Sequence, residues 1–326
     1  MSISKIFAYI FTAVALIFEG FFGIIPFIQF LLQIVVIAFA MYFFVSLFRR
    51  KAPMIWREVV VRYIIAMTAT IGFFTTLFLS FIGYHHLVPG VVSDITLSHS
   101  GQEVVFIGMS HIATPEFYSI KQQKIASLAQ SGYTILVEWV KPGTPENQTI
   151  FNQSMGFDFT PTLYSKIASV INLQSQDNKM LYSGILTGSL ESIDLSIDEI
   201  VALMWTGWIT STGNIVNLEW EIQETLSKAS KQELLFTGWV ARWLLNWSLK
   251  QSDDIETVLT SGLQAQLFST IIDRRNDKII EYIQNNPDKK IAIVYGALHF
   301  NGIYEALQKI DSSWKTINVD ISTPYK

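Results

Sequence analysis

The chain has 326 residues, of which 50% are hydrophobic and 15% are charged, and its formal net charge is −4. So large an apolar fraction argues against a wholly soluble protein, and the acidic balance argues against a nucleic-acid-binding protein. The absence of cysteine excludes disulfides, thiolate nucleophiles and thiolate metal sites.

The apolar residues are concentrated near the N-terminus. Residues 27–48 and 63–83 each supply an apolar run of roughly 20 residues, the length that an α-helix needs to cross a bilayer. The run 6–25 contains an acidic residue and is followed by Pro26, which would end a helix there, so it is either a third span or one arm of a re-entrant hairpin. We therefore predict a membrane anchor over residues 1–84, with two or three transmembrane helices.

The loop between the two clear spans is strongly basic, with five basic residues and one acidic residue between residues 49 and 62. Short basic loops stay in the cytoplasm, so the chain after His85 is expected outside the plasma membrane. This outer part holds 25 acidic and 17 basic residues. We expect the lipid bilayer as a partner and no nucleic acid, and the helical spans would also allow a homodimer.

Residues 90–326 show an alternation of strands and helices. The segments 103–111 and 133–140 read as strands, and 114–132 reads as the helix between them. Strand, helix and strand with short connections predict a right-handed crossover and a parallel sheet. Near the C-terminus the same alternation returns, as helix 273–286, strand 289–299, helix 300–310 and strand 314–322. The expected fold class is α/β, with a mostly parallel sheet, flanking helices and a mainly helical insertion over about residues 150–270.

Two of these strands end in the same pattern, Gly-x-x-His, at Gly108 with His111 and at Gly296 with His299. Ligands of open α/β sheets bind beyond the carboxyl ends of the strands, and glycine lets the backbone turn sharply there. If the two strands are neighbours, both imidazoles project into one cleft.

Glu138 interrupts the otherwise apolar strand 133–140. A buried carboxylate is costly without a partner, so we expect it to meet a cation, a metal or a hydrogen-bond donor. Two imidazoles and a carboxylate form a common ligand set for a catalytic divalent metal with an open water position. The ordinary alternative is that each histidine is a loop or core residue.

Arg275 lies on the helix before the second histidine strand. It either forms a surface salt bridge with Asp273 or Asp277, or it binds a substrate carboxylate or an oxyanion.

Three other histidines are not expected to be ligands, because they lie at the end of a span or in a hairpin turn: His85, His86 and His99.

Tryptophans recur every four residues at Trp239, Trp243 and Trp247. Core packing is the ordinary explanation of such a stripe. The alternative is a surface that faces the membrane or holds a peptide, since tryptophan favours the membrane interface.

The pair "FIGMSH" and "VYGALH", the glutamate of "LVEWV" and the Arg-Asn of "DRRNDK" together resemble the TraB family, which includes pheromone-shutdown proteins, GumN-like proteins and Tiki proteins. The resemblance covers about residues 95–322. It rests on the order and setting of the motifs, because each motif alone is short. The wider fold also resembles that of erythromycin esterases and of ChaN-type haem-binding lipoproteins.

The resemblance implies a membrane-tethered peptidase that depends on a divalent metal such as manganese, cobalt or zinc. The family motifs fall on the two Gly-x-x-His pairs, Glu138 and Arg275. Glu116, in the matching segment "HIATPEFY", is a further candidate for the general base, and Asp194 in "SIDLSID" matches weakly. Here the spans precede the outer domain, whereas in the pheromone-shutdown proteins they follow it, which puts a pheromone role in doubt.

Three functions remain open from the sequence. In the first, a metallohydrolase cuts an extracytoplasmic peptide or signal, with His111, Glu138 and His299 as metal ligands and Glu138 or Glu116 as general base. In the second, the domain sequesters a small hydrophobic peptide without turnover. In the third, a metal-independent esterase uses His111 or His299 to deprotonate water.

Overall fold

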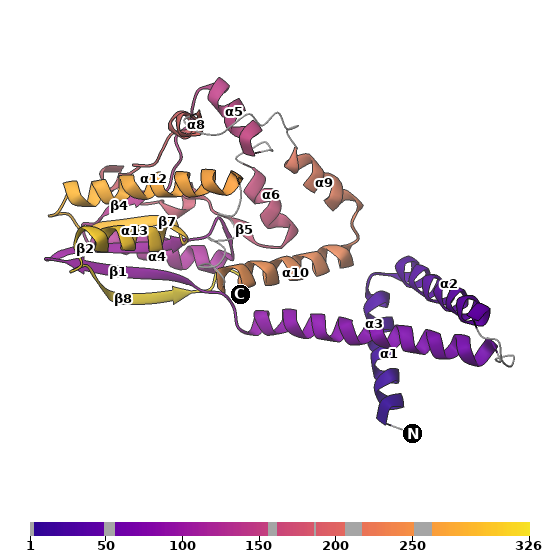
Figure 1. Cartoon of the computed structure of the whole chain (residues 1–326). Helices are drawn as coiled ribbons and strands as arrows, with labels where there is room; N and C mark the ends of the chain where they lie inside the picture. Colours follow the sequence, from indigo (N-terminus) through magenta and orange to yellow (C-terminus); the bar gives the residue numbers. More distant parts are fainter. Residues whose placement is uncertain (1–2, 49–55, 156–161, 186, 206–216, 251–262) are drawn as a thin grey trace. The chain divides into compact units, whose positions relative to one another are not determined.

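The computed structural model describes residues 3–48, 56–155, 162–185, 187–205, 217–250 and 263–326 (Figure 1). The chain divides into two compact units. The first contains Met1–Val88 and Ala229–Trp243, and the second contains Pro89–Lys228 and Leu244–Lys326. Ala229–Trp243, which the sequence places in the outer domain, therefore groups with the N-terminal helices.

The first unit is helical. It contains α1 (Ile3–Phe21), α2 (Ile24–Phe48), α3 (Trp56–Leu87) and the first part of α10 (Lys231–Lys250). Two of the described helices are long and apolar enough to cross a membrane, namely α2 over Pro26–Phe44 and α3 over its whole length.

The break between α1 and α2 lies earlier than expected. Gly23 has a φ of +113°, which favours glycine, and it separates the two helices. Pro26 lies in the first turn of α2, where a missing amide hydrogen costs no helical hydrogen bond, so it does not end α1.

In the second unit the main sheet has six strands in the order β6-β4-β7-β2-β1-β8. The strands are β1 (Val92–His99), β2 (Gln102–Met109), β4 (Thr134–Val137), β6 (Leu190–Glu191), β7 (Ile291–Gly296) and β8 (Lys315–Ser322). The four from β6 to β2 are parallel, whereas β1 is antiparallel to both β2 and β8. The α/β fold with a mostly parallel, mixed sheet and flanking helices is therefore confirmed.

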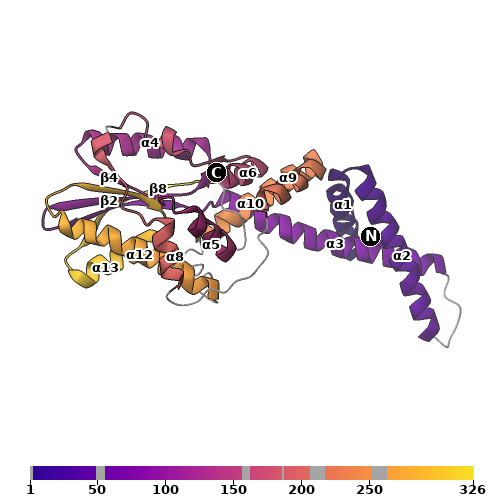
Figure 2. The same ribbon diagram turned by 90° about the horizontal axis from the view of Figure 1, so that it is seen from above.

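Helices cover both faces of this sheet. Helix α4 (Pro115–Gln130) lies on one face, and α12 (Leu263–Asn285) and α13 (His299–Ile310) lie on the other (Figure 2). Strand β7 shows why, because Ala292 and Val294 pack into the α4 core and Ile293 and Tyr295 pack into the α12–α13 core. A strand that is buried on both faces must be apolar throughout, as its sequence is.

The described residues between β4 and α12 are mainly helical, and they also complete the sheet. Strand β6 extends the main sheet beyond β4, and β5 (Gln174–Ser175) pairs with β3 (Ile112–Ala113), directly after His111. The described helices of this region are α5 (Pro145–Met155), α6 (Leu163–Val170), α7 (Asn178–Leu181), the 3₁₀ turn η1 (Thr187–Ser189), α8 (Ile197–Trp205), α9 (Leu218–Lys228) and α10.

Candidate functional site

The two Gly-x-x-His strands are neighbours in the sheet. Strand β2 pairs in parallel with β7, with Met109 opposite Gly296, and β4 pairs with the other side of β7. Since parallel strands end at the same edge, His111, Glu138 and His299 all follow strands at one edge of the sheet.

Glu138 lies just beyond its strand rather than within it, which corrects the expected strand 133–140. Strand β4 ends at Val137, and the Glu138 amide makes the last hydrogen bond, to the Val294 carbonyl at 3.1 Å. Trp139 is 54% exposed, because the chain leaves the sheet at this point. The carboxylate turns back toward β7, where Oε2 accepts a hydrogen bond of 2.6 Å from the Gly296 amide.

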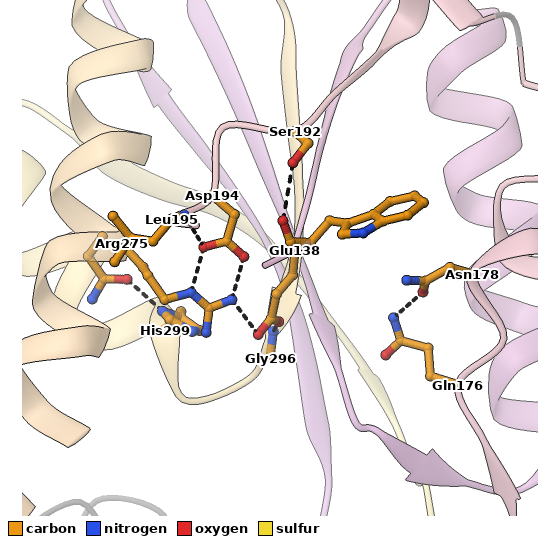
Figure 3. A network of polar contacts seen from close by, with 11 residues as sticks. Glu138, Gln176, Asn178, Ser192, Asp194, Leu195, Arg275, Gly296 and His299 are labelled. Atoms are coloured by element: carbon orange, nitrogen blue, oxygen red, sulfur yellow. Dashed lines mark hydrogen bonds and ion pairs between the residues drawn. The ribbon is translucent and has the colours of Figure 1, made fainter. Parts of the chain in front are cut away.

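Arg275 holds two carboxylates together (Figure 3). Its Nε and Nη2 donate to Oδ1 and Oδ2 of Asp194, each at 2.7 Å, and Nη2 also donates to Oε1 of Glu138 at 2.7 Å. These partners differ from the surface aspartates that the sequence offered, and it is the neighbouring Arg274 that contacts Asp277, at 3.4 Å. The Arg275 side chain therefore lies at the edge of the sheet, where it contacts Asp194 and Glu138.

The cluster is largely shielded from solvent, with the side chain of Arg275 10% exposed, that of Glu138 13% and that of Asp194 0%. Burial alone would raise the pKa of Glu138. The positive charge of Arg275, with smaller effects of His299, His111 and the Gly296 amide, lowers this pKa to about 2. Glu138 is thus a carboxylate at any physiological pH.

His299 is the first residue of α13 and is only 5% exposed. Its Nδ1 donates to Oδ1 of Asn276 at 2.7 Å, so the ring carries its proton on Nδ1 and keeps a lone pair on Nε2. Burial lowers the pKa of His299 to about 4, although Glu138 opposes this shift. The imidazole is therefore neutral, with Nε2 able to bind a metal ion or accept a proton.

The side chain of Asn276 is itself fixed by its surroundings. It is 4% exposed, and a Cβ atom at Gly302, one turn into α13, would lie 2.5 Å from its Nδ2. Gly302 therefore leaves the space that the Asn276 amide needs to orient His299.

His111 has a different environment. It is exposed, and its ring stacks on Tyr164 of α6 with the ring centres 4.9 Å apart. The backbone carbonyl oxygen of His111 accepts a hydrogen bond of 2.9 Å from the backbone amide of Gln176, next to the β3–β5 pair. The backbone is thus held while the ring lies at the surface.

The glycines of the two motifs do not serve the turn that the sequence suggested, because neither has a positive φ. Gly108 is required by close approach, since a Cβ atom there would lie 2.6 Å from the Ser93 carbonyl oxygen on β1. Its amide donates to Oδ1 of Asp94 at 3.1 Å, and the buried Lys121 contacts the same oxygen at 2.5 Å. At Gly296 the nearest atom would be Oε2 of Glu138, at 3.5 Å.

Not all candidate residues join the site. Glu116 lies exposed in the first turn of α4, and no contact described for it reaches Glu138, Arg275 or either motif histidine. Across the described ranges, no three histidine, aspartate or glutamate side chains lie close enough together to hold a metal ion. His111, Glu138 and His299 therefore share an edge without forming a closed ligand set.

No family model, curated protein or solved structure matches this chain. The resemblance to the TraB family therefore rests on the sequence motifs alone.

Several residues around the site were missed or undervalued by the sequence analysis. Asp194 is the bidentate partner of Arg275, and its signal was an aspartate between two apolar residues. Asn276 lies on the same buried stripe of α12 as Ile279 and Ile283, so a polar residue at helical spacing from apolar ones was its signal. Tyr164 gave no signal, because only the tertiary structure brings α6 to His111.

Three buried polar atoms near this edge have no hydrogen-bond partner in the described part of the chain: Oη of Tyr182, Oη of Tyr295 and Oε1 of Gln176. Burial, followed by a small effect of Glu138, raises the pKa of Tyr182, so its hydroxyl stays protonated. Unpaired buried groups are costly in a native protein. They are two hydroxyl donors and one acceptor without a partner in the described ranges, on residues near an ionised carboxylate and a neutral imidazole.

Proposed function

We propose that this protein is a membrane-anchored hydrolase and, more specifically, a divalent-metal-dependent peptidase that acts on an extracytoplasmic peptide or signal. One observation carries the proposal. The parallel pairing of β2, β7 and β4 brings the residues that follow each strand, His111, His299 and Glu138, to one edge of the sheet. Active sites of open α/β sheets lie at this edge.

The protonation states support metal binding by these residues. Glu138 is ionised and His299 is a neutral imidazole with a lone pair on Nε2, which are the forms that bind a cation. The bond from His299 to Asn276 is the kind of outer contact that orients a metal-binding histidine. His111, Glu138 and His299 would hold the ion, and closing the set requires His111, the exposed member, to move. A bound ion would supply a water of lowered pKa as the nucleophile.

The remaining residues of the site have supporting roles in this proposal. Arg275 compensates the charges of Asp194 and Glu138 and holds Glu138 beside His299. The unpaired hydroxyls of Tyr182 and Tyr295 would donate to carbonyl oxygens of a substrate, and the Gln176 amide oxygen would accept from its N–H groups. A peptide group offers both a carbonyl oxygen that accepts and an N–H group that donates.

The proposed location follows from the first unit. Two helices long and apolar enough to cross a membrane precede the α/β unit, and the basic loop between them is expected in the cytoplasm. We therefore place the α/β unit outside the plasma membrane.

One observation favours a second candidate, a hydrolase without a metal. Both oxygens of Glu138 already accept hydrogen bonds, from Arg275 and from the Gly296 amide. In this candidate Nε2 of His299 would take the proton from water directly, as a general base.

The test uses the full chain in detergent micelles, incubated with a peptide library with and without a chelator. Cleavage that needs added metal, and that falls at least about 100-fold in His111→Ala and in His299→Ala, is expected. The control is His99→Ala, which removes a partly exposed histidine that bonds Asp311 and lies beside the start of β2, at the opposite end of this strand from His111. Cleavage that ignores the chelator supports the second candidate. Peptide binding without any product contradicts both and leaves sequestration.

A further inference from the structure

The first half of α10 carries an aromatic surface that the hydrolase proposal does not use. Residues Ala229–Trp243 group with α1, α2 and α3 in the first unit. Phe236 meets Phe18 of α1 and Phe22, the residue after α1, edge-on, with ring centres 5.5 and 5.3 Å apart. This part of the helix thus packs on the C-terminal end of α1.

The two tryptophans that follow pack on the C-terminal end of α3. Trp239 stacks on His86 at 5.3 Å, and its carbonyl oxygen lies 3.1 Å from Nε2 of the same histidine. Trp243 contacts the rings of Phe81 at 5.7 Å and His85 at 6.4 Å. The predicted core packing of this tryptophan stripe therefore takes place, for these two residues, against the anchor helices.

The contacts occur where the apolar run of α3 ends. No charged residue lies between Arg62 and His85 along this helix of 32 residues. At a rise of about 1.5 Å per residue the helix is longer than the roughly 30 Å hydrocarbon core of a bilayer, so its ends reach the headgroups. The end at His85 and His86 is such an end.

We propose that the first half of α10, Lys231–Trp243, is an interfacial membrane helix that lies at headgroup depth against the outer ends of α1 and α3. Tryptophan favours this depth. Lys231 and Arg242 are eleven residues apart and so fall on one side of the helix, near Leu235, which is 60% exposed. A mixture of basic and apolar residues on one side suits the boundary between phosphates and acyl chains.

The proposal gives the chain a second attachment to the lipid surface, 140 residues or so after α3 ends. It rests on the membrane spans of α2 and α3 and is independent of any catalytic activity. Residues 89–228 would then be held at the membrane at both ends, which favours substrates that are themselves close to the bilayer.

The absence of cysteine allows a direct test. A single spin label is attached at Leu235→Cys in the full chain, reconstituted in vesicles of phosphatidylcholine and phosphatidylglycerol. Its accessibility to oxygen and to a water-soluble nickel chelate reports its depth. Labels at Val36→Cys in α2 and at Ile120→Cys in α4, two exposed positions, provide the hydrocarbon and water references.

The expected result is a depth between the two references. Replacing Trp239 and Trp243 by serine should move the label toward water, whereas Trp220→Ser, on α9, should leave it unchanged. A Leu235 label as accessible to the nickel chelate as the Ile120 label overturns the proposal. A water-accessible label at Val36 overturns the membrane span and the proposal with it, and neither outcome bears on hydrolysis.

Discussion

The two Gly-x-x-His segments share a sequence pattern but differ in every contact that the structure describes. After β7, His299 is buried, neutral and hydrogen-bonded to Asn276, and the Gly296 amide donates a hydrogen bond to Glu138. After β2, His111 is exposed and stacked on Tyr164, and Gly108 is packed tightly against β1. The segment after β7 is therefore part of the buried charged cluster around Arg275. The segment after β2 has a hydrogen-bonded backbone and an exposed histidine side chain.

This difference shows that a repeated motif need not have a repeated role. The second segment supplies a preorganised base or ligand, whose tautomer is set by a buried amide. The first supplies an exposed side chain that stacks on Tyr164. In the following predictions, changes to the histidine and arginine on the β7 side have the larger effect on stability, whereas the glycine change has its larger effect on the β2 side.

The largest effect is expected from Arg275→Ala. This change leaves Asp194 and Glu138 buried without their cation, which costs about 3–5 kcal/mol of the free energy of unfolding. Arg274→Ala is the matched control, because its ion pair with Asp277 is exposed and contributes about 1 kcal/mol or less. Denaturant unfolding of the full chain in micelles measures both, and equal losses would show that the cluster does not stabilise the fold.

The next effect is a pH dependence of stability. The pKa of His299 falls from 6.5 to about 4 on folding, so the unfolded chain binds this proton first. The free energy of unfolding is therefore unaffected by this group above pH 6.5. It falls as the pH drops toward 4, by up to about 3 kcal/mol. Glu138, lowered from 4.5 to about 2, acts in the same direction at lower pH.

The variant His299→Gln should flatten the curve of unfolding free energy between pH 6.5 and 4. Chemical unfolding at a series of pH values measures this slope. Parallel curves for the two proteins would mean that His299 is not buried in its neutral form.

The two glycines should respond differently to alanine. Gly108→Ala forces a Cβ atom against the Ser93 carbonyl oxygen and Cγ1 of Val92, both at 2.6 Å, and should cost about 1–3 kcal/mol. Gly296→Ala meets nothing closer than 3.5 Å, so we expect the fold to tolerate it. Thermal unfolding compares the stability of the two variants. A larger loss of stability in Gly296→Ala than in Gly108→Ala would contradict the close packing assigned to Gly108.

The smallest stability effect is expected from His111→Ala. It removes one exposed aromatic stack on Tyr164, worth about 1 kcal/mol or less. Thermal unfolding should show a shift well below that of His299→Ala. A shift as large as that of His299→Ala would mean that His111 is part of the core.

The sequence predicted the parts of this site that depend on strand order. Apolar runs and short connections identified β2, β4 and β7, and the crossover rule predicted that β2 and β4 are parallel. It did not predict that β7 lies between them, and whether β7 is a neighbour of β2 stayed open. Glu138 was identified because a carboxylate in an apolar strand needs a partner. Its partner could not be identified, because Arg275 is 137 residues away and only the packing of α12 on the sheet brings the two together.

Other features depended on tertiary contacts that leave no local pattern. The stack of His111 on Tyr164 requires the β3–β5 pair, whose strands have two residues each. The glycine at position 108 was attributed to backbone freedom, whereas the cause is the close approach of β1. The tryptophan stripe had the helical spacing of a core, but the sequence could not tell that its partners are α1 and α3.

The central claim is that His299 enters the site as a neutral imidazole, with its proton on Nδ1 and its lone pair on Nε2. Nitrogen NMR of the full chain labelled with ¹⁵N-histidine reads this directly, with the His299 signals identified by their loss in His299→Ala. At pH 6 we predict one protonated nitrogen, assigned to Nδ1, and one unprotonated nitrogen, unchanged until the pH approaches the pKa of about 4. Two protonated nitrogens at pH 6, or a single proton on Nε2, would contradict the account.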